Sequence, residues 1–257
     1  MNSLPGSLAF DFDGILCNGL KEYFQTAWRV YCKFWTVSDT TPPEGLAERF
    51  YKLRPVVEVG WEMPVVIRAA IKGFSDDEIL LGWHQVRQEL VDSEDLDKKA
   101  IGQSVDSTRD QWIENELEAW LDLHSFYPGV VDQLQSLQAA DFPFVIVTTK
   151  ESRFVKKLLE RANIQLDSDK IFGKDCKRPK PQTLRMLKAS LPQPIWFVED
   201  RIAALRAVQA EEDLKDIGLF LGDWGYNIER DRLEAENDPI LHRLSLEQFP
   251  QALETWI

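Results

Sequence analysis

Hydrophobic and polar positions follow two different periodicities along the chain. Short apolar runs bounded by glycine or polar residues predict buried strands, and they lie at residues 8–10, 144–147, 170–173, 195–198 and 218–221. Amphipathic segments with helical spacing separate the last four of these runs. Strands that alternate with helices form mostly parallel sheets with right-handed connections. The pattern therefore predicts an α/β fold with a parallel sheet.

The stretch between the first two apolar runs is different. Apolar positions from Leu20 to Phe34 recur at helical spacing, and Ser75 and Glu78 form the capping-box pattern that opens a further helix. Residues 17–126 contain several such segments and no convincing strand, and the α/β pattern resumes at Tyr127. We therefore expect an α/β core formed by residues 1–16 and 127–257, interrupted by an all-helical insert at 17–126.

Composition and charge exclude several classes of function. The chain has 257 residues, 44% of them hydrophobic, and a net charge of −13 at pH 7. Such a charge argues against nucleic acid and an anionic membrane as partners, because both need a basic surface. No apolar run reaches spanning length, the N-terminus has no secretory signal pattern, and three cysteines lie at no metal-like spacing. These features predict reduced thiols and a cytoplasmic location, and they leave a monomer and a homodimer open.

Candidate chemistry gathers at the strand ends. Asp11 and Asp13 follow the first strand, Thr148 follows the second, and Glu199 and Asp200 follow a later one. Side chains two residues apart on an extended backbone point to the same side, and ligands of open α/β sheets bind at the carboxyl ends of strands. Converging carboxylates suit Mg²⁺. The alternatives are purely structural roles: an Asx turn at Asp13 and helix capping by the other polar residues.

Each of these residues could have a distinct role in phosphoryl transfer. Asp11 would attack phosphorus as a nucleophile, and Asp13 would protonate the leaving oxygen and later activate water. Thr148 and a lysine from the basic stretch 174–180 would hold the transferring oxygens. We expect a metal site formed by Asp11, Asp13 through its backbone carbonyl, and Asp200, with Glu199 in a supporting position.

The same motifs resemble those of the haloacid dehalogenase superfamily. The resemblance rests on four motifs in order: Asp11-Phe12-Asp13-Gly14, Val147-Thr148-Thr149-Lys150, Lys180-Pro181 and Val198-Glu199-Asp200. It implies a Rossmann-like, doubly wound core, a Mg²⁺ cofactor and phosphoryl transfer, with the helical insert as a cap domain. The third motif leaves its register open: we favour Lys180, which precedes a proline at a helix start, over Arg178 and Lys177.

The leading hypothesis is a Mg²⁺-dependent phosphatase that forms an aspartyl-phosphate and acts on a small phosphorylated metabolite. A phosphotransferase or phosphomutase, or an inactive binding or regulatory protein of the same fold, are the alternatives. We expect Thr149 and Arg178 to contact substrate at the core. In the insert, the irregular stretch 54–63 offers Arg54 and Glu62 as substrate contacts, against the alternative that these residues form ion pairs within the insert.

Overall fold

The structure is a computed structural model that describes residues 4–257. The chain divides into two compact units, one built from the segment ending at Asn18 together with Ser125–Ile257, and the other from Gly19–His124. The expected boundaries were two residues off on each side. The short strands β2 (Cys17–Asn18) and β3 (Ser125–Phe126) pair antiparallel, and this pairing assigns them to the α/β unit. Two-residue strands carry no periodicity, so the sequence pattern could not predict them.

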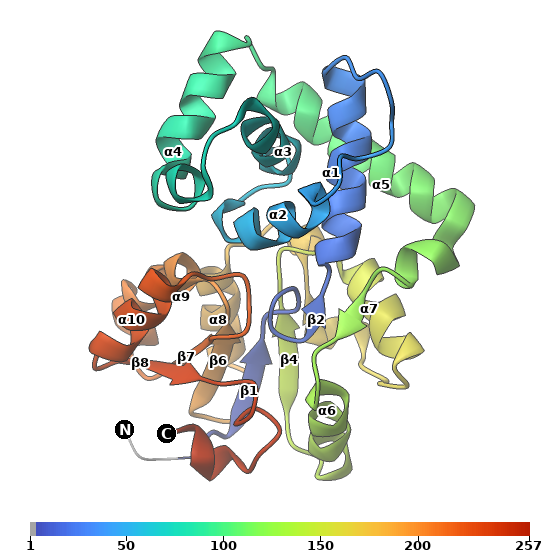
Figure 1. The fold of residues 1–257 in the computed structure, drawn as a ribbon. Coiled ribbons are helices and arrows are strands. Elements are labelled where there is room, and N and C mark those ends of the chain that lie inside the picture. Colours follow the sequence, from blue (N-terminus) through green and yellow to red (C-terminus); the bar gives the residue numbers. More distant parts are fainter. Residues whose placement is uncertain (1–3) are drawn as a thin grey trace. The chain divides into compact units, whose positions relative to one another are not determined.

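A parallel six-stranded sheet forms the centre of the α/β unit, in the order β5-β4-β1-β6-β7-β8 (Figure 1). The strands are β1 (Ser7–Phe10), β4 (Phe144–Val147), β5 (Ile171–Phe172), β6 (Ile195–Glu199), β7 (Gly218–Gly222) and β8 (Leu241–Leu244). This arrangement confirms the predicted α/β, Rossmann-like fold. β1 lies between β4 and β6, where the strand order changes direction, and this is the position at which open α/β sheets bind ligands.

Alternate residues of the strands face opposite sides of the sheet. On one side, Phe197 and Leu221 pack with Leu184 of a helix and Leu205 of the next. On the other side, Phe10 and Trp196 contact aromatic residues of the C-terminal segment, among them Phe249 and Trp256. Both faces of the sheet are thus buried, which explains why its strands appear as continuous apolar runs. The edge strand β8 has two half-buried polar residues and was missed by the sequence pattern for that reason.

Helices complete both units (Figure 1). In the α/β unit they are α6 (Val130–Ala139), α7 (Ser152–Arg161), α8 (Lys180–Lys188), α9 (Ile202–Gln209) and α10 (Glu229–Asn237). In the other unit they are α1 (Leu20–Phe34), α2 (Leu46–Leu53), α3 (Glu62–Lys72), α4 (Asp76–Ser93) and α5 (Lys98–Leu121). Helix α1 packs against α3 and α5. The expected capping box of Ser75 and Glu78 opens α4. Glu116 has non-helical dihedral angles and kinks α5.

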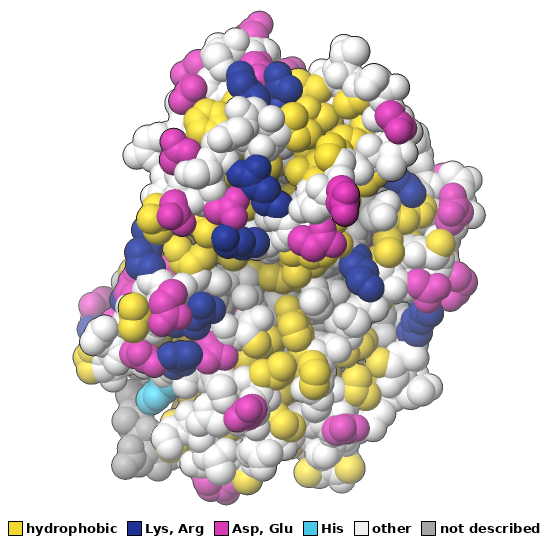
Figure 2. All heavy atoms as spheres, in the orientation of Figure 1, with side chains coloured by type: hydrophobic (Ala, Val, Ile, Leu, Met, Phe, Trp, Pro, Cys, Tyr) yellow, Lys and Arg dark blue, Asp and Glu magenta, His cyan; other side chains and the backbone are white. Residues whose placement is uncertain are grey.

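Two features of the structure bear on the partners that the composition argued against. On the face drawn in Figure 2, Lys and Arg side chains are intermixed with Asp and Glu and do not form a continuous basic surface. Among residues 4–257, none of the helices combines the length and the apolar character needed to cross a membrane.

Candidate active site

Asp11 lies at the carboxyl end of β1, in the middle of the sheet. Its backbone N–H donates to the Val198 carbonyl at 2.9 Å, continuing the β1–β6 ladder, and its Oδ1 accepts from the Phe12 N–H at 2.8 Å. The chain then turns at Gly14, which has a φ of +89°. A Cβ at this glycine would lie 2.1 Å from Oδ2 of Asp200. Glycine is therefore required here for both its backbone conformation and its lack of a side chain.

Three buried carboxylates converge beside this turn. Ligand oxygens of Asp11, Glu199 and Asp200 lie within 4.8 Å of one another, and the three residues are at most 6% exposed. Burial, together with the neighbouring charge of Glu199, raises the pKa of Asp11 to about 7. Burial also raises the pKa of Glu199 to about 7 and that of Asp200 above its ordinary value. Desolvation and mutual repulsion therefore oppose the charged state of this cluster.

One lysine enters the carboxylate cluster. Nζ of Lys180 lies 3.0 Å from Oδ2 of Asp11 and also donates to Oε2 of Glu199. Both acids raise the pKa of Lys180 against the effect of its burial, so the ammonium stays charged. Arg178 is exposed, and its guanidinium is directed to Sδ of Met186 at 2.7 Å. Among the residues that the third motif left open, the structure therefore places Lys180 with the acids and Arg178 away from them.

Asp200 is held by the loop after β7, which no motif in the sequence links to the site. The backbone N–H of Tyr226 donates to Oδ2 of Asp200 at 2.7 Å, and Nδ2 of Asn227 donates to its carbonyl oxygen at 3.0 Å. Both donors follow β7, the neighbour of β6 in the sheet. The only available signal was the cluster of glycines after that strand, which is ordinary turn chemistry in the sequence.

The other polar strand ends contribute Thr148 and Asp13. Thr148 is buried, and its Oγ1 accepts from the backbone N–H of Lys150 at 3.2 Å. Thr149 is exposed. Nζ of Lys150 donates to Oδ1 of Asp13 at 3.2 Å. Lys150 belongs to the second motif, but the sequence pattern assigns it no role, because its contact with Asp13 joins residues that follow two different strands.

The charge balance of the cluster fits a divalent cation. Asp11, Glu199 and Asp200 can carry three negative charges, and Lys180 supplies one positive charge in contact with them. A buried site with an excess of carboxylate oxygens is the donor set that Mg²⁺ accepts. Glu199 is already engaged, because Lys180 binds one of its oxygens and the backbone N–H of Arg201 donates to the other at 3.0 Å. Asp11 and Asp200 are thus the side chains best suited to direct coordination.

The two residues expected from the helical insert have contacts within their own unit. The carboxylate of Glu62 is fully buried, pairs with Arg87, and accepts from the backbone N–H groups of Glu58 and Val59. These bonds occupy the carboxylate in holding the start of α3, as in the alternative of an ion pair within the insert. Arg54 lies over the ring of Tyr23 at 4.7 Å and donates to the Val57 carbonyl at 3.0 Å.

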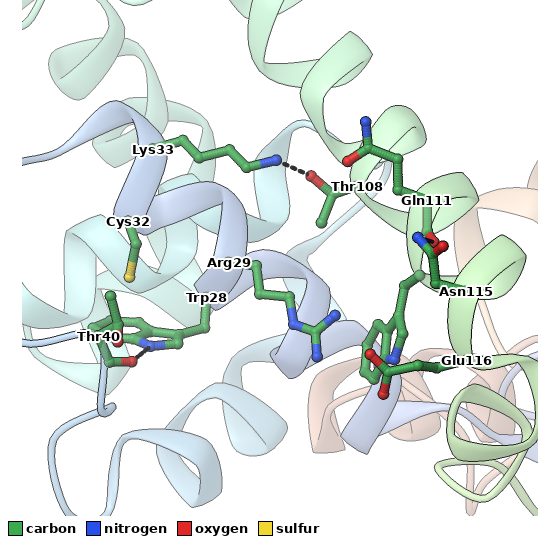
Figure 3. Close-up of a pocket in the computed structure, with 10 residues that line it drawn as sticks. Trp28, Arg29, Cys32, Lys33, Thr40, Thr108, Gln111, Asn115 and Glu116 are labelled. Atoms are coloured by element: carbon green, nitrogen blue, oxygen red, sulfur yellow. Dashed lines mark hydrogen bonds between the residues drawn. The ribbon is translucent and has the colours of Figure 1, made fainter.

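The helical unit also contains a cavity of about 420 Å³ between α1 and α5 (Figure 3). Its two basic side chains have partners within the unit: Lys33 donates to Oγ1 of Thr108 at 2.7 Å, and the Arg29 guanidinium lies 3.6 Å from the centre of the Trp112 ring. Among its lining residues, Glu116 is the only carboxylate. The converging acids of the α/β unit are the better candidate for chemistry.

Comparison with known proteins places this site in a family context. The model of the haloacid dehalogenase-like hydrolases matches residues 7–210. A phosphoglycolate phosphatase of Pseudomonas putida is 26% identical over 246 residues, covering 93% of this chain and 76% of the relative. A phosphoglycolate phosphatase of Escherichia coli is 33% identical over 107 residues, which are 39% of this chain and 41% of the relative.

Solved structures share the fold. A predicted phosphatase from Clostridium acetobutylicum superimposes with a TM-score of 0.62 at 17% identity, covering 97% of this chain and 98% of that chain. Protein tyrosine kinase A of Mycobacterium tuberculosis has a TM-score of 0.55 at 16% identity, covering 98% of this chain and 99% of that chain. At such low identity the likeness establishes the architecture, and the reaction must be argued from the site itself.

Proposed function

The chain belongs to the haloacid dehalogenase-like hydrolase family and is therefore a hydrolase, and we propose that it is a Mg²⁺-dependent phosphatase that works through a phosphoryl group on Asp11. The observation that carries this proposal is the convergence of Asp11, Glu199 and Asp200 at the centre of the sheet, where Lys180 pairs with the first two. This arrangement combines a nucleophile with groups that bind a metal and a phosphate.

The reaction divides into two displacements at phosphorus. In the first, an oxygen of Asp11 attacks the phosphoryl group, the bond from phosphorus to the ester oxygen breaks, and Asp13 gives that oxygen its proton. In the second, Asp13 takes a proton from a water molecule whose oxygen attacks the phosphoaspartate. The bond from phosphorus to Asp11 then breaks, which releases phosphate and restores both carboxyl groups.

The surrounding residues supply charge and orientation. The ammonium of Lys180 and the hydroxyl of Thr148 would bind the non-bridging oxygens, whose charge is redistributed in the transition state. Asp11, Asp200 and the backbone carbonyl of Asp13 would hold Mg²⁺, with Glu199 in the supporting position. The bound cation would offset the repulsion between carboxylates and phosphate and polarise the phosphoryl group.

We further propose that the substrate is a small phosphorylated metabolite. The two relatives described above carry the name phosphoglycolate phosphatase, so phosphoglycolate is the first compound to test. The helical unit is inserted between the first two motifs, and the strands that lead into and out of it, β2 and β3, pair with each other. It would select substrates by covering the site during turnover, and Arg54 is its candidate anion contact.

The test is turnover with phosphoglycolate and with p-nitrophenyl phosphate, in Mg²⁺ and then in EDTA. Release of inorganic phosphate that EDTA abolishes and Mg²⁺ restores is expected. An acid-stable, hydroxylamine-labile phosphoryl label on the wild-type chain, absent from Asp11→Asn, would locate the intermediate. Full activity in EDTA would contradict the metal requirement. Transfer of the phosphoryl group to an added alcohol or sugar in preference to water would favour a phosphotransferase.

A further inference from the structure

Lys150 is a buried cation that the mechanism above does not use. Its side chain is 6% exposed, and its Nζ lies 3.2 Å from Oδ1 of Asp13, whose side chain is 12% exposed. Burying an ammonium group costs free energy unless a charged or polar partner repays it. Asp13 is a charged partner of this kind, so the role of Lys150 should be sought in its contact with Asp13.

The backbone around Lys150 is fixed from two directions. Its N–H donates to Oγ1 of Thr148, and its carbonyl accepts from the N–H of Lys174 at 2.9 Å. Gly173 packs so closely that a Cβ there would lie 2.4 Å from the Lys150 carbonyl oxygen. The loop after β5 therefore sets the position of the turn after β4, and with it the point from which the Lys150 side chain reaches Asp13.

Asp13 lies in the turn between β1 and β2. It follows β1 by three residues and precedes Gly14, whose backbone N–H is bonded to the Cys17 carbonyl at 2.9 Å. These bonds hold the backbone, whereas the carboxylate is held by the neighbouring strand through Lys150. A group that both gives and takes a proton in one turnover must return to the same place after each transfer.

We propose that Lys150 is a positioning residue for Asp13, holding its carboxyl group where it can give a proton to the leaving oxygen and then, as the carboxylate, take one from water. This inference rests on the proposed function. It assigns Lys150 no contact with the phosphoryl group, which Lys180 and Thr148 bind. The turn after β4 would thus contribute two residues to the site: Thr148 would bind the phosphoryl group, and Lys150 would position the acid–base group Asp13.

The test replaces the ammonium and keeps the length of the side chain. With phosphoglycolate, whose leaving oxygen needs a proton, Lys150→Met should lower kcat by about 10²-fold, the cost of a misplaced catalytic group, with KM nearly unchanged. With p-nitrophenyl phosphate the loss should be small, because p-nitrophenolate leaves without protonation. Lys150→Arg should recover most of the activity. Lys157→Met is the matched control, since Lys157 is exposed on α7.

Two further measurements separate this role from others. In an Asp13→Asn background, Lys150→Met should cause no additional loss with phosphoglycolate, because the group it positions is already gone. A crystal structure of Lys150→Met should show the Asp13 side chain displaced, and this readout holds whatever reaction the enzyme catalyses. An equal loss on both substrates with raised KM, or an Asp13 side chain that keeps its place, would overturn the proposal. Absence of phosphatase activity in the wild-type chain would overturn only the proposed function.

Discussion

The two units of this protein bury carboxylates in opposite ways. In the helical unit, each buried glutamate has an arginine of its own. Glu22 receives two bonds from Arg109, at 2.7 and 3.1 Å, and Glu62 pairs with Arg87. In the α/β unit, three acids converge, and the single lysine Lys180 pairs with two of them, Asp11 and Glu199.

The surroundings of Glu22 show what a structural carboxylate looks like. Besides Arg109, it accepts bonds from Oγ1 of Thr26 at 2.7 Å and from Nε1 of Trp120 at 3.2 Å. Its charge is balanced and its oxygens are satisfied, so it joins α1 to α5 and has no capacity left for a ligand. The cluster around Asp11 keeps an excess of negative charge, which a metal and a phosphoryl group would use. Burial is common to both regions, and charge balance distinguishes them.

The largest effect should come from the nucleophile. Asp11→Asn removes the attacking oxygen, and turnover should fall by more than about 10³-fold, since removal of a covalent nucleophile disables the whole mechanism. The same change removes one of three repelling carboxylates, so the melting temperature in EDTA should rise or stay constant. Phosphate release measures the loss of turnover, and thermal unfolding measures the melting temperature. A marked drop in melting temperature would show that Asp11 supports the fold, as Glu22 does.

The corresponding change in the helical unit should affect stability instead. Glu22→Gln leaves the guanidinium of Arg109 without its carboxylate, and breaking a buried pair by removing one partner costs about 3 kcal/mol. Urea unfolding followed by circular dichroism measures this loss. Glu89→Gln, an exposed change on α4, is the control and should leave the free energy of unfolding within about 0.5 kcal/mol. A Glu22→Gln variant as stable as the control would contradict the structural role.

Mg²⁺ should stabilise one region and not the other. A cation bound at about 100 times its dissociation constant stabilises the native state by about 2.7 kcal/mol. The wild-type chain should therefore melt at a higher temperature in Mg²⁺ than in EDTA. Asp200→Asn should lose this increase, whereas Glu62→Gln, with its pair lying within the helical unit, should keep it. An undiminished increase in Asp200→Asn would place the metal elsewhere.

The smallest expected effect is a difference in pH dependence. Burial would raise the pKa of Glu94, but hydrogen bonds from Arg68, Trp35 and Lys72 lower it to about 2. The carboxylate of Glu94 therefore stabilises the native state fully above about pH 5, and this contribution disappears as the pH falls toward 2. Asp11, with its pKa raised to about 7, binds more protons when folded, so its effect has the opposite sign. It destabilises the metal-free protein increasingly from pH 4 to 7.

Thermal unfolding in EDTA from pH 3 to 8 measures both trends. The stability difference between the wild-type chain and Glu94→Gln should shrink at low pH. The gain in stability of Asp11→Asn over the wild-type chain should grow toward pH 7. If the stability difference from the wild-type chain varied with pH in the same way for both variants, burial would have the same effect on the acids of the two regions, which would contradict the comparison.

The convergence of acidic residues at the strand ends could be predicted from the sequence. Asp11, Glu199 and Asp200 follow apolar runs that the pattern predicted, and the structure brings their ligand oxygens within 4.8 Å. Local patterns could not indicate that Glu62 pairs with Arg87, which lies 25 residues away on another helix. They could not indicate the contact between Lys150 and Asp13 either, because it spans 137 residues. The proposed catalytic roles remain predictions.

The sequence by itself determined the family, the parallel sheet and the order of its acidic strand ends, because periodicity, turn residues and strand-end motifs are local properties. Only the tertiary structure decided that Lys180 rather than Arg178 enters the carboxylate cluster. It also decided that Glu62 pairs with Arg87 and that Lys150 contacts Asp13. These outcomes depend on which side chains meet across different strands and helices. Whether a buried acid is structural or chemical depends on the charges that surround it, and those come together only when the chain folds.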